Sequence, residues 1–168
     1  MDEERELERA TFAAGCFWGI EAAFRQIKGV IETAVGYTGG SITEPNYKEV
    51  CSGRTGHAES VGIIFDTAVV SYEKLLDTFW NIHDPTQVNR QGQDIGTSYR
   101  SAIFYHSPEE KEQAEASKAR LATSEKYLGK TIATEIVPAP QFWKAEEYHQ
   151  QYYEKCGRGY CASPKCWE

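Results

Sequence analysis

The sequence predicts an α+β fold, a two-layer sandwich in which helices cover a mixed central sheet. Along the 168 residues, hydrophobic positions switch repeatedly between strand-like alternation and helical spacing, and no repeat or low-complexity linker interrupts them. A hydrophobic fraction of 40% is enough for one core of ordinary domain size. We therefore expect one domain over residues 1–168, with a long irregular C-terminal tail over about 156–168.

The first part of the chain alternates strands and helices. Residues 11–15 predict a short strand, and apolar side chains then recur at helical spacing over 17–27 until Gly29. A second strand is expected over 30–37. The long loop predicted over 38–58 contrasts with short loops elsewhere, and loops of that length often carry function.

The middle of the chain continues this alternation. A half-buried strand is expected over 61–65, followed by a helix that Ser71 caps and that ends near 83–85. Residues 99–106 predict the next strand. In Ser107-Pro108-Glu109-Glu110, the serine is an N-cap, the proline fits the first turn, and the second glutamate completes a capping box.

Two further elements precede the tail. Residues 131–137 are β-branched and predict a strand, which Pro138 and Pro140 interrupt. Residues 144–155 are rich in tyrosine and predict a final helix.

Composition excludes several classes of protein. A formal net charge of -7 argues against nucleic acid as the main partner. The acidic start differs from a signal or transit peptide, and no apolar run reaches membrane-spanning length, so we expect a cytoplasmic protein without a membrane partner. Five unevenly placed cysteines do not suit a disulfide scaffold, which leaves reactive thiols or metal ligation.

Chemistry is concentrated in Gly15-Cys16-Phe17-Trp18-Gly19, at a predicted strand-to-helix junction. The positive end of a helix dipole stabilises a thiolate, so a cysteine at that position is a candidate nucleophile. The alternative is a buried structural cysteine. Phe17 and Trp18, taken alone, fit an ordinary core.

The sequence resembles the class A peptide methionine sulfoxide reductases. The resemblance begins with the Cys16 motif and with Gly36-Tyr37-Thr38-Gly39-Gly40. Further blocks follow in the family's order: Asn46-Tyr47, Val50-Cys51-Ser52-Gly53, Thr55-Gly56-His57-Ala58-Glu59, His83-Asp84-Pro85-Thr86 and the run from Gln91 to Ser101. The resemblance implies an oxidoreductase that repairs oxidative damage by reducing free or peptide-bound methionine S-sulfoxide to methionine.

The resemblance also implies roles for individual residues. Cys16 matches the nucleophile and Glu59 the proton donor, since sulfoxide reduction needs a thiolate that attacks sulfur and an acid that protonates oxygen. Aromatic neighbours would raise the pKa of Glu59 by desolvation. Without the family, Glu59 would be interpreted as a solvated surface charge.

Other matching positions surround these two. Tyr47, Tyr99 and Asp94 match groups that hold the sulfoxide oxygen and orient the site, and Phe17 and Trp18 match the pocket for the substrate methyl group. From residue type alone, either tyrosine could be a packing residue and Asp94 a turn residue.

Recycling is expected to use cysteines in the tail. A sulfenic acid on Cys16 can condense with a second thiol to form a disulfide. Cys161 is favoured as the resolving thiol because its Gly-Tyr-Cys context resembles the family's, while Cys156 and Cys166 stay candidates for a relay. The family implies thioredoxin as external reductant and no bound cofactor. Cys51 has no assigned role and fits a small buried hydrophobe.

Three alternatives come from other functional classes. The three tail cysteines with His149 could bind zinc, although their spacing lacks a C-x-x-C pair, and we expect no metal. A Cys-His hydrolase could use Cys16 with His57 or His149 as base. Finally, the aromatic residues could form a binding cage without catalysis. We expect a monomer, since no apolar helix face is left over.

Overall fold

The computed structural model describes residues 6–153, and within them a six-stranded mixed sheet forms the centre of the fold. The strand order is β7-β6-β1-β3-β2-β8, and the neighbours are antiparallel except for the parallel pair β6 and β7. These strands are β1 (Leu7–Ala14), β2 (Val30–Thr38), β3 (Ala58–Asp66), β6 (Ser101–Tyr105), β7 (Glu135–Pro138) and β8 (Trp143–Lys144). The predicted tail lies outside the described residues.

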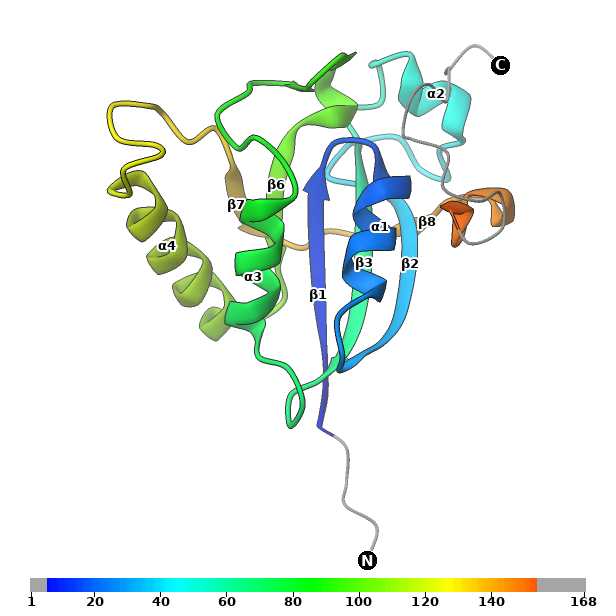
Figure 1. Ribbon diagram of the computed structural model, residues 1–168. Helices are drawn as coiled ribbons and strands as arrows, with labels where there is room; N and C mark the ends of the chain where they lie inside the picture. Colours follow the sequence, from blue (N-terminus) through cyan, green and yellow to red (C-terminus); the bar gives the residue numbers. More distant parts are fainter. Residues whose placement is uncertain (1–5, 154–168) are drawn as a thin grey trace, which may run out of the picture.

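Helices cover one face of this sheet, which confirms the predicted α+β sandwich (Figure 1). The helices are α1 (Phe17–Arg25), α2 (Tyr47–Cys51), α3 (Tyr72–Asn81) and α4 (Pro108–Ala122). A small ribbon of β4 (Arg90–Gln91) and β5 (Asp94–Ile95) and the 3-10 turns η1 (Thr97–Tyr99) and η2 (Glu147–His149) complete the described elements. No helix in residues 6–153 is both long and apolar enough to cross a membrane.

Aromatic stacking joins the two layers. Phe12 of β1 is fully buried, and its ring centroid lies 5.3 Å from that of Phe24 in α1 and 5.1 Å from that of Phe79 in α3. Burial of rings this large is a main source of stability in a small core. Successive side chains of a strand point to opposite faces of the sheet. Because Phe12 points towards the helices, its neighbours in β1 point to the other face.

The predicted N-caps of α3 and α4 are confirmed. The Ser71 hydroxyl accepts a hydrogen bond from Lys74 N, and the Ser107 hydroxyl accepts one from Glu110 N. The capping box predicted at α4 is only half correct. Glu110 Oε1 accepts from the backbone N–H of His106, one residue before the N-cap.

The loop predicted over 38–58 is interrupted by α2. Asn46 caps this short helix, because its side chain accepts from Glu49 N while Glu49 Oε1 accepts from Asn46 N. This pair is a capping box with asparagine as its first residue. The sequence signal was present, but it lay in a segment that contains four glycines and a proline directly before Asn46.

Two predicted strands are longer than the observed ones. Tyr99 belongs to η1, and β6 begins only at Ser101. The strand expected over 131–137 begins at Glu135, where parallel pairing with Ala102 of β6 starts. Both observed strands therefore begin where backbone pairing with a neighbouring strand begins.

The helix predicted over 144–155 is wrong up to residue 151. The chain instead forms β8 and η2, and we call residues 143–151 the C-terminal strap. Gln150 explains the difference, since its side-chain amide accepts from Val35 N and donates to Val35 O at 2.9 Å each, pairing with β2 like a strand. Gly36 of β2 lets the chain at residues 142–144 lie close against this strand, because a Cβ at Gly36 would lie 2.6 Å from the Phe142 ring.

Candidate active site

Cys16 lies at the N-terminus of α1, directly after β1. Gly15 makes this turn with a φ of 98°, which favours glycine, and a Cβ there would lie 2.8 Å from the Gln91 side chain. Cys16 is 7% exposed and is a thiol rather than half of a disulfide. The positive end of the α1 dipole therefore acts on its sulfur.

Glu59 lies beside this helix start. It belongs to β3, is 1% exposed, and its Oε1 accepts a hydrogen bond from Phe17 N at 3.3 Å. Its direct partner across the sheet is Tyr37 of β2. The interpretation of Glu59 as a solvated surface charge is thus excluded.

Tyr99 contacts Glu59 and lies within electrostatic reach of Asp94. Its side chain hydrogen-bonds with that of Glu59, and burial raises its pKa, with the charges of Glu59 and Asp94 adding to the effect. The hydroxyl therefore keeps its proton and can donate. Burial also raises the pKa of Asp94 in β5, although that carboxyl is partly exposed.

Tyr47 approaches the same place from α2. Its pKa is raised by burial first and then by the charges of Glu59, Tyr99 and Cys16. It is also a protonated donor, and its first-turn backbone N–H donates to Glu146 Oε2 at 3.1 Å. The structure thus brings Cys16, Glu59, Tyr47 and Tyr99 within electrostatic reach of one another.

Phe17 and Trp18, the two residues after Cys16, belong to an aromatic cluster. The Phe17 ring is 1% exposed and lies 5.7 Å from the Tyr37 ring and 6.4 Å from the Tyr47 ring. Trp18 is 7% exposed and stacks on Tyr152 with centroids 3.6 Å apart. Both residues therefore belong to the core, directly after Cys16 in the chain.

The C-terminal strap brings Glu146, for which the sequence predicts no role, and His149, which is predicted only as an alternative hydrolase base or zinc ligand, next to the predicted site residues. Glu146 Oε1 accepts from the Tyr37 hydroxyl at 3.0 Å while its Oε2 accepts from Tyr47 N. His149 is fully buried, and its Nδ1 accepts from the Trp18 indole N–H at 2.8 Å. The sequence signal was weak, because these residues lie in a segment that predicted a helix.

A buried carboxylate fastens the strap to α1. Glu21 is 1% exposed and accepts hydrogen bonds from Gln151 N at 2.7 Å and from the Thr33 hydroxyl at 2.7 Å. A buried carboxylate is costly unless such donors satisfy it. Glu21 therefore joins α1, β2 and the strap beneath the site.

The two histidines proposed as hydrolase bases have other partners. His57 Nδ1 accepts from Gly40 N at 3.0 Å, and its Nε2 lies 2.6 Å from Ile42 O, so both ring nitrogens hold the loop after β2. Nδ1 of His149 is occupied by Trp18. This arrangement favours a structural role for His57.

The expectation for Cys51 is wrong. It is the last residue of α2, and its side chain is half-buried and disulfide-bonded rather than a fully buried free thiol. The predicted resolving residues Cys156, Cys161 and Cys166 lie outside the described residues. Among residues 6–153, no group of three or more His, Cys, Asp and Glu side chains could hold a metal ion.

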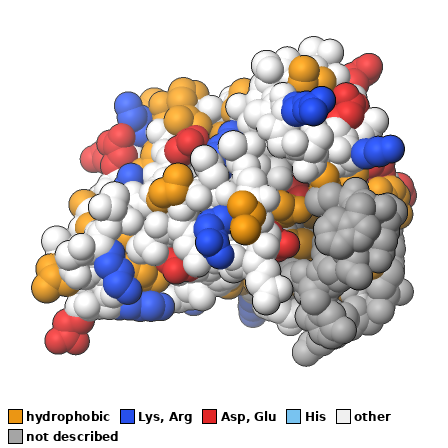
Figure 2. All heavy atoms as spheres, turned by 90° about the horizontal axis from the view of Figure 1, so that it is seen from above, with side chains coloured by type: hydrophobic (Ala, Val, Ile, Leu, Met, Phe, Trp, Pro, Cys, Tyr) orange, Lys and Arg blue, Asp and Glu red, His pale blue; other side chains and the backbone are white. Residues whose placement is uncertain are grey.

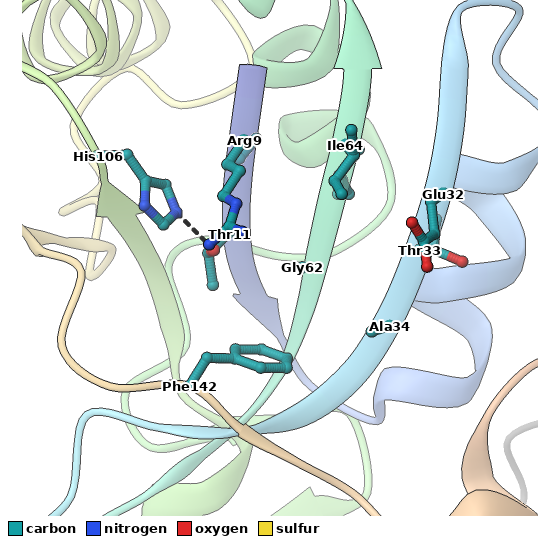
Figure 3. Close-up of a pocket in the computed structure, with 11 residues that line it drawn as sticks. Arg9, Thr11, Glu32, Thr33, Ala34, Gly62, Ile64, His106 and Phe142 are labelled. Carbon is teal, nitrogen blue, oxygen red and sulfur yellow. Dashed lines mark hydrogen bonds between the residues drawn. The ribbon is translucent and has the colours of Figure 1, made fainter. Parts of the chain in front are cut away.

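A cavity on the opposite face of the sheet is separate from this site. It is lined by Arg9 and Thr11 of β1, with Gly62, His106 and Phe142 around them (Figure 3). The Thr11 hydroxyl and His106 Nε2 are hydrogen-bonded in its lining, 2.8 Å apart. None of the predicted site residues within 6–153 lines this cavity. Figure 2 looks instead onto the end where α1 and α2 begin, and hydrophobic side chains show near the centre of that face.

Comparison with known proteins agrees with this geometry. The model of the family "PMSR: Peptide methionine sulfoxide reductase" matches residues 8–166. "Peptide methionine sulfoxide reductase MsrA" of Methanoculleus marisnigri is 59% identical over 161 residues, which cover 96% of this chain and 98% of that protein.

Solved structures show the same fold. Reduced Mxr1 from Saccharomyces cerevisiae superposes with a TM-score of 0.86 at 37% identity, covering 95% of this chain and 90% of that one. Mxr1 in complex with Trx2 superposes with a TM-score of 0.62 at 26% identity, covering 90% and 87%.

Proposed function

Because this chain belongs to the peptide methionine sulfoxide reductase family, we propose that it reduces methionine sulfoxide, free or within peptides, to methionine. Cys16 is the proposed nucleophile. The observation that carries the proposal is the meeting of a thiol at a helix N-terminus with a buried carboxyl and two protonated tyrosines. The family's preference for the S epimer is part of the proposal.

The first step transfers one oxygen atom. The Cys16 thiolate attacks the sulfoxide sulfur, which is reduced by two electrons and leaves as methionine, while Cys16 becomes a sulfenic acid. The helix dipole favours the thiolate before attack. Negative charge develops on the sulfoxide oxygen during this step and must be neutralised.

Glu59 is the proposed proton donor to that oxygen. A carboxyl that is 1% exposed resists ionisation because it has lost the water that stabilises its charge. Tyr47 and Tyr99 hold the oxygen through their O–H groups, as an oxyanion hole does. Asp94 orients Tyr99 from β5, and Phe17 and Trp18 receive the substrate methyl group.

Recycling uses thiols. A second cysteine condenses with the sulfenic acid, which releases water and forms a disulfide. Cys161 is the favoured resolving residue, and Cys156 and Cys166 are candidates for a relay. Thioredoxin is the proposed reductant of the last disulfide, supported by the complex of Mxr1 with Trx2. No prosthetic group is required, and a monomeric state and cytoplasmic location stay predictions.

A single-turnover assay tests the proposal. Fully reduced protein without added reductant is mixed with each epimer of a blocked methionine sulfoxide, and methionine and thiols are counted. One or two equivalents of methionine from the S epimer, with matching loss of thiols, are expected. Cys16→Ser should form none, whereas Cys51→Ser is a matched control that should still form methionine. No methionine from the unaltered protein would reject the proposal.

A further inference from the structure

Trp18 makes one specific polar contact in an otherwise apolar environment. Its indole N–H can donate but cannot accept, and it donates to His149 Nδ1 at 2.8 Å. The ring of Trp18 is 7% exposed, so water cannot readily replace this acceptor. The hydrogen bond fixes the side-chain torsions of Trp18. Stacking on Tyr152 alone would let the indole slide in the plane of the ring.

His149 is held firmly enough to serve as a fixed acceptor. It is fully buried, and its ring lies 4.3 Å from the Tyr47 ring and 5.2 Å from the Phe17 ring. The following residues, Gln150 and Gln151, hydrogen-bond to β2 and to Glu21. The backbone on this side of the imidazole is therefore tied to the sheet and to α1.

The ionisation state of His149 suits this role. Burial lowers its pKa to about 4, with the charge of Glu146 opposing the effect, so the ring is neutral at pH 7. Since Nδ1 accepts, Nε2 must carry the proton of the neutral ring. Within residues 6–153, Nε2 is buried and makes no hydrogen bond. The environment thus satisfies the nitrogen that faces Trp18 and leaves the other one unsatisfied.

We propose that His149 is a positioning residue that holds the Trp18 indole as a wall of the substrate pocket. This inference rests on the proposed function, because Trp18 is a proposed contact of the substrate methyl group. His149 acts through Trp18 and needs no contact with the reacting atoms. It links the C-terminal strap to the pocket, although 131 positions separate the two bonded residues.

Variants at residue 149 separate the acceptor from the packing. His149→Phe keeps a ring of similar size and removes the acceptor, whereas His149→Asn places Oδ1 near the position of Nδ1. Loss of one neutral hydrogen bond corresponds to a factor of about 3 to 10. We expect kcat/KM for the S-sulfoxide to fall by about that factor in His149→Phe, mainly through KM, and His149→Asn to recover most of it.

A matched control removes the acceptor of another buried indole. Trp80 donates to the Ser117 hydroxyl at 2.7 Å, between α3 and α4. Ser117→Ala should lower stability without changing KM. The rate at which iodoacetamide alkylates Cys16 should stay within about twofold of the unaltered rate in both His149→Phe and Ser117→Ala. Neither substitution alters the N-terminus of α1, which sets the reactivity of the thiol.

NMR of the indole groups gives a readout that is independent of activity. With ¹⁵N-labelled tryptophan, the Trp18 N–H should exchange with solvent slowly in the unaltered protein and in His149→Asn, and faster in His149→Phe. Unchanged KM and unchanged exchange in folded His149→Phe would overturn the inference. If the unaltered protein itself fails to reduce the sulfoxide, the proposed function fails, and the exchange experiment still decides whether His149 fixes Trp18.

Discussion

Replacing Glu59 by glutamine removes the proposed acid with little change in shape. The carboxyl lies 3.3 Å from Phe17 N through Oε1, and a glutamine amide oxygen can accept the same hydrogen bond. It can also accept from Tyr99. Glu59→Gln should therefore fold normally while it loses a proton that can be transferred.

The size of the effect follows from what the variant keeps. A positioned general acid contributes a factor of about 10² to 10⁴ to the rate. Tyr47 and Tyr99 stay protonated in the variant because burial raises their pKa values, so two donors still face the oxygen. We therefore expect a loss near the lower limit, about 10²-fold, which corresponds to about 2.7 kcal/mol in the barrier.

The assay must isolate the first chemical step from recycling. Rapid mixing of fully reduced protein with the S-sulfoxide, followed by quenching in acid, gives the rate of methionine formation in one turnover. Glu32→Gln is a matched control, because Glu32 is exposed on the neighbouring strand β2, and its rate should equal that of the unaltered protein. Urea denaturation checks that both variants are folded.

A methionine-forming rate in Glu59→Gln within about twofold of the unaltered rate would refute the assignment, since an acid contributes at least about 10²-fold. If Glu32→Gln formed methionine as slowly as Glu59→Gln, the loss of rate would come from the removal of a negative charge and not from the removal of the acid. Either result would require another source for the proton, and Asp94 would be the next residue to test.

Further predictions concern stability. Burial raises the pKa of Glu110 from 4.5 to about 7, so the protein loses stability as pH rises from about 4.5 to about 7, and the loss is complete above that range. Glu110→Gln avoids this loss, so its free energy of unfolding relative to that of the unaltered protein should be larger at pH 8 than at pH 5. The difference should grow by at most about 1.4 kcal/mol per pH unit. Equal differences at pH 5 and pH 8 in urea titrations would contradict this. Gly40→Ala should cost about 1–3 kcal/mol by thermal denaturation, because its Cβ would collide with the backbone of Thr55 and His57. Phe12→Ala should cost about 3–5 kcal/mol, whereas exposed Val69→Ala should cost far less.

Local signals in the sequence predicted much of the fold. Ser71 and Ser107 mark helix starts whose hydrogen bonds lie within a few residues, so the sequence around them contains all the necessary information. The Cys16 junction is of the same kind, since Gly15 and the first turn of α1 are contiguous. The grouping of Glu59, Tyr47 and Tyr99 around Cys16 was predicted only through the family resemblance.

Long-range contacts explain the errors. The strap lies in a segment, residues 144–155, that was predicted as a tyrosine-rich helix, but Gln150 pairs with Val35, 115 positions away. The side-chain amide of Gln150 replaces the backbone of a neighbouring strand as the hydrogen-bond partner of Val35, and no local sequence pattern indicates such a contact. Similarly, the role of His149 depends on Trp18, and its sequence neighbours give no sign of that partner.

The attachment of the strap to Glu21 has a consequence for synthesis of the chain. Glu21 and Gln151 are 130 positions apart, and at 5–20 residues per second the ribosome needs on the order of ten seconds to add that stretch. During this interval Cys16 has already been made, but the wall behind Trp18 has not. A nascent chain therefore carries the Cys16 thiol well before it carries the residues that hold Trp18 and Glu21 in place.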